Sequence, residues 1–140
     1  MHALEEAWRV LRPDGLLVDL RPSIVHRLVG VRRSGRTRRV GRMNEWFGDD
    51  VAANRAVAEI LRRKRFRQVR RDRFDCTRTM DRFADFRRWL DHYVTTGKLP
   101  SHDWLVEKLA RALRGGGART VVSGPLDLRV LVKVGRGGGR

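Results

Sequence analysis

Three side chains near residue 20 could take part in chemistry: Asp19, Arg21 and His26. Asp19 and Arg21 stand at the end of a short apolar run, residues 16–20, that predicts a buried strand. In wound α/β sheets, ligands bind beyond the carboxyl ends of the strands. We therefore predict a substrate pocket here, in which Asp19 accepts hydrogen bonds and Arg21 binds an anion. The alternative is that these two charges pair with neighbours as the strand leaves the core.

A second group of candidate residues is cationic. Seven arginines lie within residues 27–42 with no acid between Asp19 and Glu45, and residues 62–73 hold eight bases against the single acid Asp72. Arginines on a β-ribbon can lie along phosphates, so both segments predict a polyanion-binding surface. The candidate residues are Arg32, Arg33, Arg36, Arg38, Arg39, Arg62, Arg63 and Arg65. The alternative is a solvated basic surface that has no ligand.

The sequence does not favour metal or nucleophilic chemistry. The four histidines have no ligand spacing with the single cysteine, Cys76, or with one another, and we predict no metal site. The adjacent carboxylates Asp49 and Asp50 are explained as helix-start residues. No phosphate-loop or hydrolase motif is present. A single cysteine excludes an internal disulfide and suits a reducing compartment, so we expect a cytoplasmic protein.

The whole chain is strongly basic. Its 140 residues hold 32 Lys and Arg against 16 Asp and Glu, a formal net charge of +16. The excess is spread over both halves of the chain and is not confined to a tail. Such a charge favours nucleic acid or an anionic substrate as a ligand, but an arginine-rich composition without a ligand would give the same count. No apolar run is long enough to span a membrane.

Apolar periodicity predicts the elements that must position these residues. Helices are expected at 3–11, 49–64, 81–94 and from 101 to the glycines at 115, and strands at 16–20, 24–42 (a hairpin turning at Ser34-Gly35), 66–79 and 119–134. The aromatic stripe of residues 81–94 is expected in the core rather than as a base-stacking platform. Gly124-Pro125 is expected to break the last strand. We predict one domain, residues 1–134, and a flexible Gly/Arg tail, residues 135–140.

The first helix–strand junction carries a family resemblance. Residues 6–15 resemble the E-x-x-R-V-L-R-P-G-G sequence that leads into the fifth strand of class I (Rossmann-like) S-adenosylmethionine-dependent methyltransferases. The matching residues are Glu6, Arg9, Val10, Leu11, Arg12, Pro13 and Gly15, and Asp14 stands where glycine is usual. The resemblance implies that residues 16–20, 66–78 and 119–134 are the fifth, sixth and seventh strands, with the seventh antiparallel between the other two. The helices before the last strand would then be an insertion that lids the substrate side.

The resemblance also implies what this stretch of chain does not carry. Family members bind the cofactor through a glycine-rich loop after the first strand and an acidic residue that ends the second. Only eight residues precede Arg9, and neither the glycines at 115–117 nor those at 137–139 replace that loop. The implied fold is a truncated Rossmann-like methyltransferase sheet: the last three strands, a basic β-hairpin and four helices. We expect no cofactor for this chain alone, and S-adenosylmethionine only if a missing half or a partner supplies the site.

Two functional hypotheses follow. The first is a methyltransferase-like protein that lacks its cofactor-binding half (a remnant, a fragment or a partner-dependent subunit) and is inactive alone. The alternative is a small basic nucleic-acid-binding protein that uses the arginine-rich hairpin. Under the first hypothesis, the strand at 16–20 would present a hydrophobic edge. We expect a second copy, another chain or the basic hairpin to cover that edge.

Overall fold

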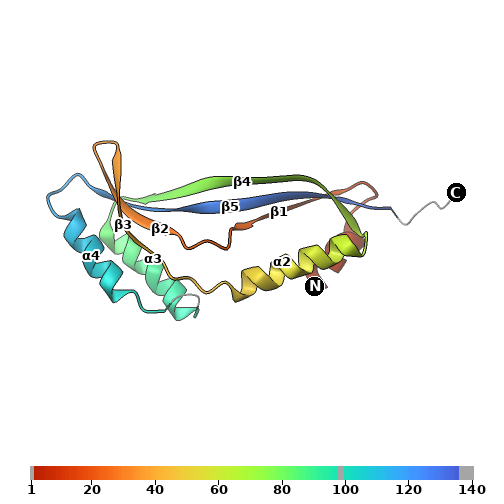
Figure 1. Ribbon diagram of the computed structural model, residues 1–140, viewed down its shortest axis with the longest axis horizontal. Helices are drawn as coiled ribbons and strands as arrows, with labels where there is room; N and C mark the ends of the chain where they lie inside the picture. The colour runs from red at the N-terminus through yellow and green to blue at the C-terminus, as the bar shows by residue number, and fades with distance from the viewer. Residues whose placement is uncertain (1, 98–99, 136–140) are drawn as a thin grey trace. The chain divides into compact units, whose positions relative to one another are not determined.

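The computed structural model describes residues 2–97 and 100–135, which form four helices and five strands (Figure 1). In chain order these are α1 (His2–Val10), β1 (Leu16–Pro22), β2 (Leu28–Arg33), β3 (Arg36–Arg42), α2 (Gly48–Arg62), β4 (Phe66–Met80), α3 (Phe83–Thr95), α4 (Asp103–Leu113) and β5 (Arg119–Lys133). Every helix and strand expected from the periodicity is present, and the α/β class is confirmed. Apart from Gly135, the predicted tail lies outside the described residues. No helix in the described part of the chain is long and apolar enough to cross a membrane.

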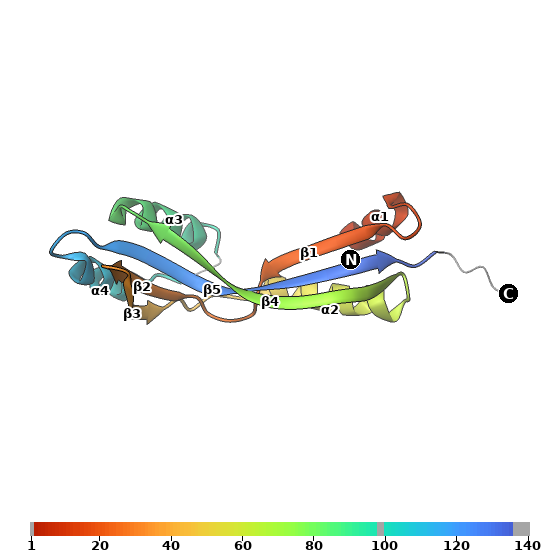
Figure 2. The same ribbon diagram turned by 90° about the horizontal axis from the view of Figure 1, so that it is seen from above.

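The sheet is built around β5. Its first half, Arg119 to Ser123, pairs antiparallel with β2, and β2 pairs in turn with β3. Its second half, Leu126 to Val132, pairs antiparallel with β1. β4 also pairs with β5, and the arrows of β1 and β4 run opposite to that of β5 (Figure 2). The last strand therefore lies between β1 and β4.

β5 continues through Gly124 and Pro125, so the predicted break is wrong. The strand changes partner at these residues, because its pairing with β2 ends at Ser123 and its pairing with β1 begins at Leu126. Proline has no N–H to donate, and it lies where pairing with β2 has ended and pairing with β1 has not yet begun. Glycine at 124 leaves room for Arg27, whose Cγ would lie 2.6 Å from an added Cβ.

The described residues divide into two compact units, each assembled from separate segments of the chain. Among the described residues, the first unit consists of 2–24, 48–74 and 126–135, and the second of 25–47, 75–97 and 100–125. β4 and β5 each contribute residues to both units. No linker-like segment marks the division, which explains why the sequence predicted one domain.

In the first unit, α1 and α2 cover one face of the sheet (Figure 1). Val57 and Ile60 of α2 are buried there with Phe66 of β4 and Leu131 of β5. Leu17 of β1 packs against this cluster from the same face. The apolar stripe of α2 thus packs against alternate residues of the strands, as the helical and strand periodicities predict.

The opposite face of β1 is apolar and exposed. Leu16, Val18 and Leu20 are 57%, 60% and 52% exposed, and no described helix covers them. Their antiparallel partners on β5 are Val132, Val130 and Leu128. The expectation of a buried strand at residues 16–20 is therefore wrong for this face of β1 among the described residues. An antiparallel pairing needs no helical crossover, so it can leave one face uncovered.

The second unit has its own core. The buried residues come from the hairpin and the loop after it, from α3 and α4, and from β4 and β5: they are Val29, Val31, Val40, Met43, Met80, Phe86, Leu90, Leu105, Leu109 and Val122. Phe83 and Tyr93 of α3 pack against this core, as predicted for the aromatic stripe, and Trp89 also packs there. The hairpin turns at Ser34 and Gly35, whose φ angles are +47° and +77°. Positive φ at both central turn residues matches the twist of the two strands.

The end of α2 gives a stability prediction. Lys64 has a left-handed φ of +54°, its N–H donates to the Leu61 carbonyl, and the N–H of Arg65 donates to the Ile60 carbonyl. Glycine is favoured at this position because a Cβ is strained there. We expect Lys64→Gly to raise the free energy of unfolding by about 1 kcal/mol in urea denaturation. Lys64→Ala keeps the Cβ and is the control; an equal gain in both variants would contradict the explanation.

Candidate functional site

Asp19 and Arg21 lie on the face of β1 that α2 covers. Arg21 donates to Asp19 Oδ2 at 2.7 Å and to Asn54 Oδ1 of α2 at 3.3 Å. Asn54 Oδ1 also accepts a hydrogen bond from Arg129 at 2.9 Å. Asp19 and Arg21 both line a hollow of about 210 Å³, whose remaining lining from α1 and α2 is apolar. The two residues form an ion pair with each other and also border a cavity.

Two residues of β5 extend this cluster. The Nε of Arg129 is buried and has no hydrogen-bond partner among the described residues. Burial, followed by repulsion from Arg21 and Arg71, lowers the pKa of Arg129. Asp127 accepts hydrogen bonds from Arg73 at 2.8 and 3.2 Å, and these lower the pKa of Asp127. The cluster therefore holds fixed charges, with Asp127 stabilised as a carboxylate rather than prepared to take up a proton.

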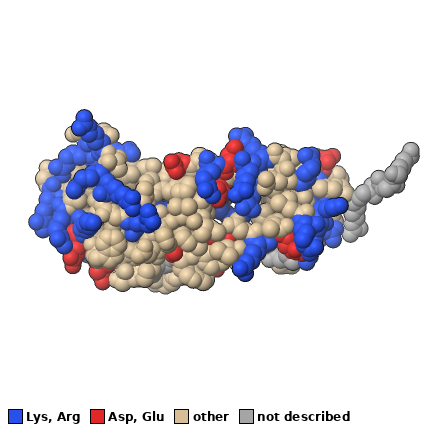
Figure 3. Space-filling view, viewed as in Figure 1, with Lys and Arg blue, Asp and Glu red and all other residues tan. Residues whose placement is uncertain are grey.

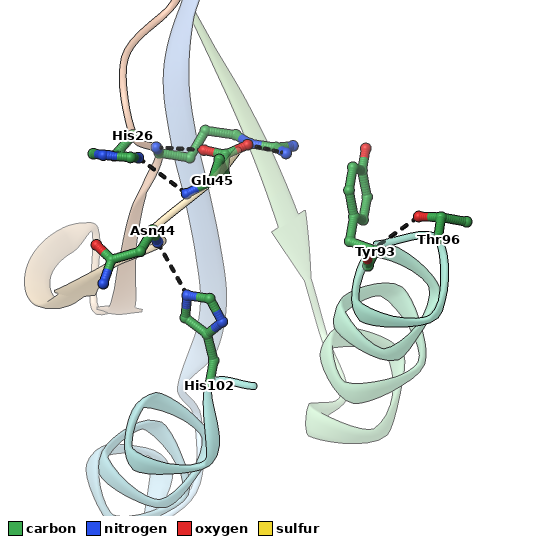
Figure 4. A network of polar contacts seen from close by, with 7 residues as sticks. His26, Asn44, Glu45, Tyr93, Thr96 and His102 are labelled. Atoms are coloured by element: carbon green, nitrogen blue, oxygen red, sulfur yellow. Dashed lines mark hydrogen bonds and ion pairs between the residues drawn. The ribbon is translucent and has the colours of Figure 1, made fainter. Parts of the chain in front are cut away.

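His26 belongs to the second unit. Its Nδ1 accepts a hydrogen bond from the backbone N–H of Glu45 at 3.0 Å (Figure 4), and its ring lies 5.1 Å from that of Phe47. His26 also borders a hollow of about 370 Å³ together with Arg39, Arg42 and Asp75. Of the three predicted pocket residues, the structure thus places Asp19 and Arg21 in the first unit and His26 in the second.

Arg27 and Glu45 form a partly buried ion pair beside His26. The carboxylate of Glu45 accepts hydrogen bonds from both Nε and Nη2 of Arg27 and from its backbone N–H, the last at 2.8 Å. The guanidinium carbon of Arg27 lies 5.1 Å from the ring centroid of Trp89 and 4.9 Å from that of Tyr93. Burial works against the charged form, but the hydrogen bond and attraction of Glu45 outweigh it and raise the pKa of Arg27. The ion pair therefore has a structural role in the second unit.

His102 fixes the same loop from the start of α4. Its Nε2 accepts a hydrogen bond from the backbone N–H of Asn44 at 3.0 Å (Figure 4). Its Nδ1 lies 2.5 Å from the carbonyl oxygen of Pro100, a contact in which Nδ1 is the donor because a carbonyl oxygen can only accept. His102 is 2% exposed. Both ring nitrogens bind backbone groups, which gives this histidine a structural role.

Hairpin cations line a groove beside α4, where Figure 3 shows Lys and Arg side chains gathered. Two neighbouring hollows, of about 450 and 280 Å³, share Arg38 and Ala112. The other cations that line them are Arg33, Arg36, Arg39, Lys108 and Arg111. Four of the eight predicted polyanion-binding residues thus lie together, and α4 adds two cations that the sequence analysis did not select.

Two local features of the hairpin shape this groove. The β2–β3 register shifts between Val29 and Gly30, which leaves Val40 as an extra residue on β3. Strict alternation would point Arg38 and Arg39 to opposite faces, yet both line the same hollow beside this bulge. At Gly41 an added Cβ would lie 2.6 Å from Leu105 Cδ1, so glycine lets α4 pack closely against β3.

The other four predicted cations are outside the groove. Arg32 donates to Thr37 Oγ1 at 3.2 Å. Arg62 and Arg63 of the first unit both donate to the carboxylate of Glu59, and these hydrogen bonds lower the pKa of Glu59 to about 2. The guanidinium of Arg65, also in the first unit, lies 4.2 Å from the ring centroid of Trp8. The second basic segment is thus largely occupied by interactions within its own unit.

No protein-family model matches the chain, and no curated protein or solved structure is detectably similar to it. The site must therefore be interpreted from its own geometry and from the motif at residues 6–15.

The described residues do not fit a dinucleotide-like cofactor loop. The glycines at 115–117 have φ angles of +98°, +71° and +62° and connect the end of α4 to β5. A cofactor loop instead connects a strand to the N-terminus of a helix, where backbone N–H groups point at the ligand. The strand-to-helix connections in the described chain, β3 to α2 and β4 to α3, contain no glycine run. We therefore derive no step through S-adenosylmethionine from these residues.

Proposed function

We propose that this chain is the substrate-side part of a class I methyltransferase and that residues outside this sequence supply the cofactor site. The observation that carries the proposal is the strand arrangement. β5 lies between β1 and β4 and runs antiparallel to β1, as the resemblance implies for the seventh strand between the fifth and sixth. The helix–turn–strand motif at residues 6–15 leads into β1, the strand that the resemblance makes the fifth.

The exposed edge and face of β1 support the proposal that the sheet continues beyond this strand. β1 is an edge strand, because β5 is its sole neighbour in the described sheet. In the family arrangement, a further strand would pair with this edge. The apolar row of Leu16, Val18 and Leu20 would then lie against an added helix, as both faces of a wound sheet do.

The second unit supports a role in substrate recognition. In the chain, its first segment (25–47) follows β1, and its second segment (75–125) runs from within β4 to within β5. Ligands of wound sheets bind beyond the carboxyl ends of the strands. The histidine-lined hollow of this unit is its candidate contact surface for a methyl acceptor. Methyl transfer itself requires in-line positioning of acceptor and cofactor.

A cofactor-binding experiment tests the proposal. The chain alone should give no heat when titrated with S-adenosylmethionine in a calorimeter. The chain completed by the coding region that adjoins it, expressed in cis or as a second chain, should bind S-adenosylmethionine stoichiometrically. Binding to the chain alone would overturn the proposal, and so would an adjoining region without a glycine-rich strand-to-helix loop.

A further inference from the structure

We infer that the groove between the β2–β3 hairpin and α4 binds the sugar-phosphate backbone of a nucleic acid. This inference is independent of the methyltransferase proposal, since it depends on the groove alone. The side chains of Arg36, Arg38, Arg39 and Lys108 form no hydrogen bond or ion pair with any described residue. A basic surface whose cations lack internal partners retains its full attraction for an external polyanion.

The other groove cations are only lightly engaged. Arg33 donates to the carbonyl oxygen of Arg114 at 2.8 Å, an interaction that leaves its charge uncompensated. Arg111 pairs with Glu107 at 3.2 Å, but both side chains are about two-thirds exposed, at 66% and 69%. Such an exposed pair contributes little and is easily exchanged for a phosphate.

Four of the cations form two pairs, one on β3 and one on α4. Arg36 and Arg38 are two residues apart on β3, about 7 Å along the strand, which is comparable with the separation of successive phosphates. Lys108 and Arg111 are three residues apart on α4, and thus about one turn from each other. A phosphate chain passing along the groove would meet cations from the strand on one side and from the helix on the other.

The lining of the groove favours a phosphate backbone over a protein partner. Its apolar residues are Val31, Val40 and Ala112, and no aromatic residue lines either hollow. Protein interfaces depend on buried aromatic and apolar anchors, whereas phosphate recognition depends on arginine and lysine. Because phosphate contacts carry no base information, binding should be independent of sequence.

A different explanation for the hairpin charges is protection of a strand edge. β3 is the outer strand of its part of the sheet, and charged residues on an edge discourage pairing with other chains. Edge protection does not require Lys108 and Arg111 on α4 to face the same groove. It also predicts no affinity for nucleic acid beyond that of the net charge.

The test is a comparison of two double variants that remove the same charge. Arg38→Ala with Arg39→Ala empties the centre of the groove, and Arg87→Ala with Arg88→Ala removes two exposed arginines of α3 that line neither hollow. Binding is measured by fluorescence anisotropy with a labelled duplex DNA and a single-stranded RNA of equal length, between about 50 and 200 mM salt. Thermal melting verifies that each variant is folded.

We expect the groove variant to weaken binding about 10- to 100-fold at low salt and to reduce the salt slope for duplex by about 2, while the α3 variant changes affinity less than about threefold. Binding to just one of the two probes would support the inference and identify the nucleic acid. Equal losses in both variants, or no binding by wild type at low salt, would overturn it. Displacement of the nucleic acid by poly-glutamate at equal charge concentration would also overturn it, in favour of an acidic protein.

Discussion

Replacing Glu45 by alanine should lower the free energy of unfolding by about 3 kcal/mol. Glu45 has a side chain that is 9% exposed and accepts three hydrogen bonds from Arg27, which is itself 21% exposed. The substitution leaves a guanidinium beside two aromatic rings without a counterion, and a backbone N–H without its acceptor. Removing one partner of a buried pair costs more than the pair contributed, because the other charge stays desolvated.

Two further substitutions make this measurement specific. Glu107→Ala breaks the exposed pair with Arg111 and should change the stability by less than about 0.5 kcal/mol. Glu45→Gln keeps an acceptor but removes the charge, so its effect should fall between the two. Urea denaturation followed by tryptophan fluorescence reports on the second unit through Trp89, which packs against its core. A decrease in the free energy of unfolding of less than about 1 kcal/mol for Glu45→Ala would show that the ion pair does not stabilise the second unit.

Two neighbouring substitutions in β1 should have opposite consequences. Leu17→Lys places a charge against the helix-covered core and should cost about 3 kcal/mol or more. Val18→Lys faces the uncovered side, where the wild-type side chain is 60% exposed, and should change the stability by less than about 1 kcal/mol. The contrast follows from the period of two along a strand.

The second consequence of Val18→Lys concerns assembly. If another segment or a second copy covers the exposed face of β1, a lysine at position 18 should weaken that association at least 100-fold, because the association would bury an unpaired charge. Sedimentation velocity measures this for self-association of the chain and for its complex with a cofactor-binding half. Wild-type protein that remains monomeric at high concentration, alone and beside that half, would contradict the proposed completion of the sheet.

The sequence predicted the elements well because each has a strong local signal. The helical stripe of α3, the alternation along β5 and the turn at Ser34-Gly35 all depend on residues close together in the chain. The Pro-Asp-Gly turn is a further case. Asp14 has a φ of +59°, a conformation that glycine adopts without strain and aspartate tolerates, so glycine is usual at this position in the motif.

What the sequence could not predict depends on packing between distant segments. Along one of its edges β5 pairs first with β2 and then with β1, and this change of partner explains how the strand can pass through Gly124-Pro125. The burial of residues 16–20 was wrong because an apolar run indicates what a strand can bury, not what covers it. A division into two units made of interleaved segments has no compositional mark.

The candidate sites show the same limit. The density of arginines in the sequence identified the hairpin as a basic surface. It could not show that Arg62 and Arg63 of the other unit are hydrogen-bonded to Glu59. Lys108 and Arg111 were missed because α4 was read for its apolar stripe alone. The sequence nevertheless contained an indication of their position. Both residues lie on the same side of the apolar stripe of Leu105 and Leu109, so both can border the element against which that stripe packs. Their meeting with β3 required the tertiary structure.

The change of partner along β5 makes this strand intolerant of odd-length insertions and deletions. Side chains alternate between the two faces of a strand, so loss of one residue at Gly124 would exchange the faces of everything after it, relative to the half paired with β2. Leu126, Leu128 and Val130 would then face the helices, and the buried Leu131 would face outwards. Changes of two residues would keep both registers. Among divergent copies of this chain, length variation in β5 should therefore occur in pairs, whereas the turn at Ser34-Gly35 is free to vary by single residues.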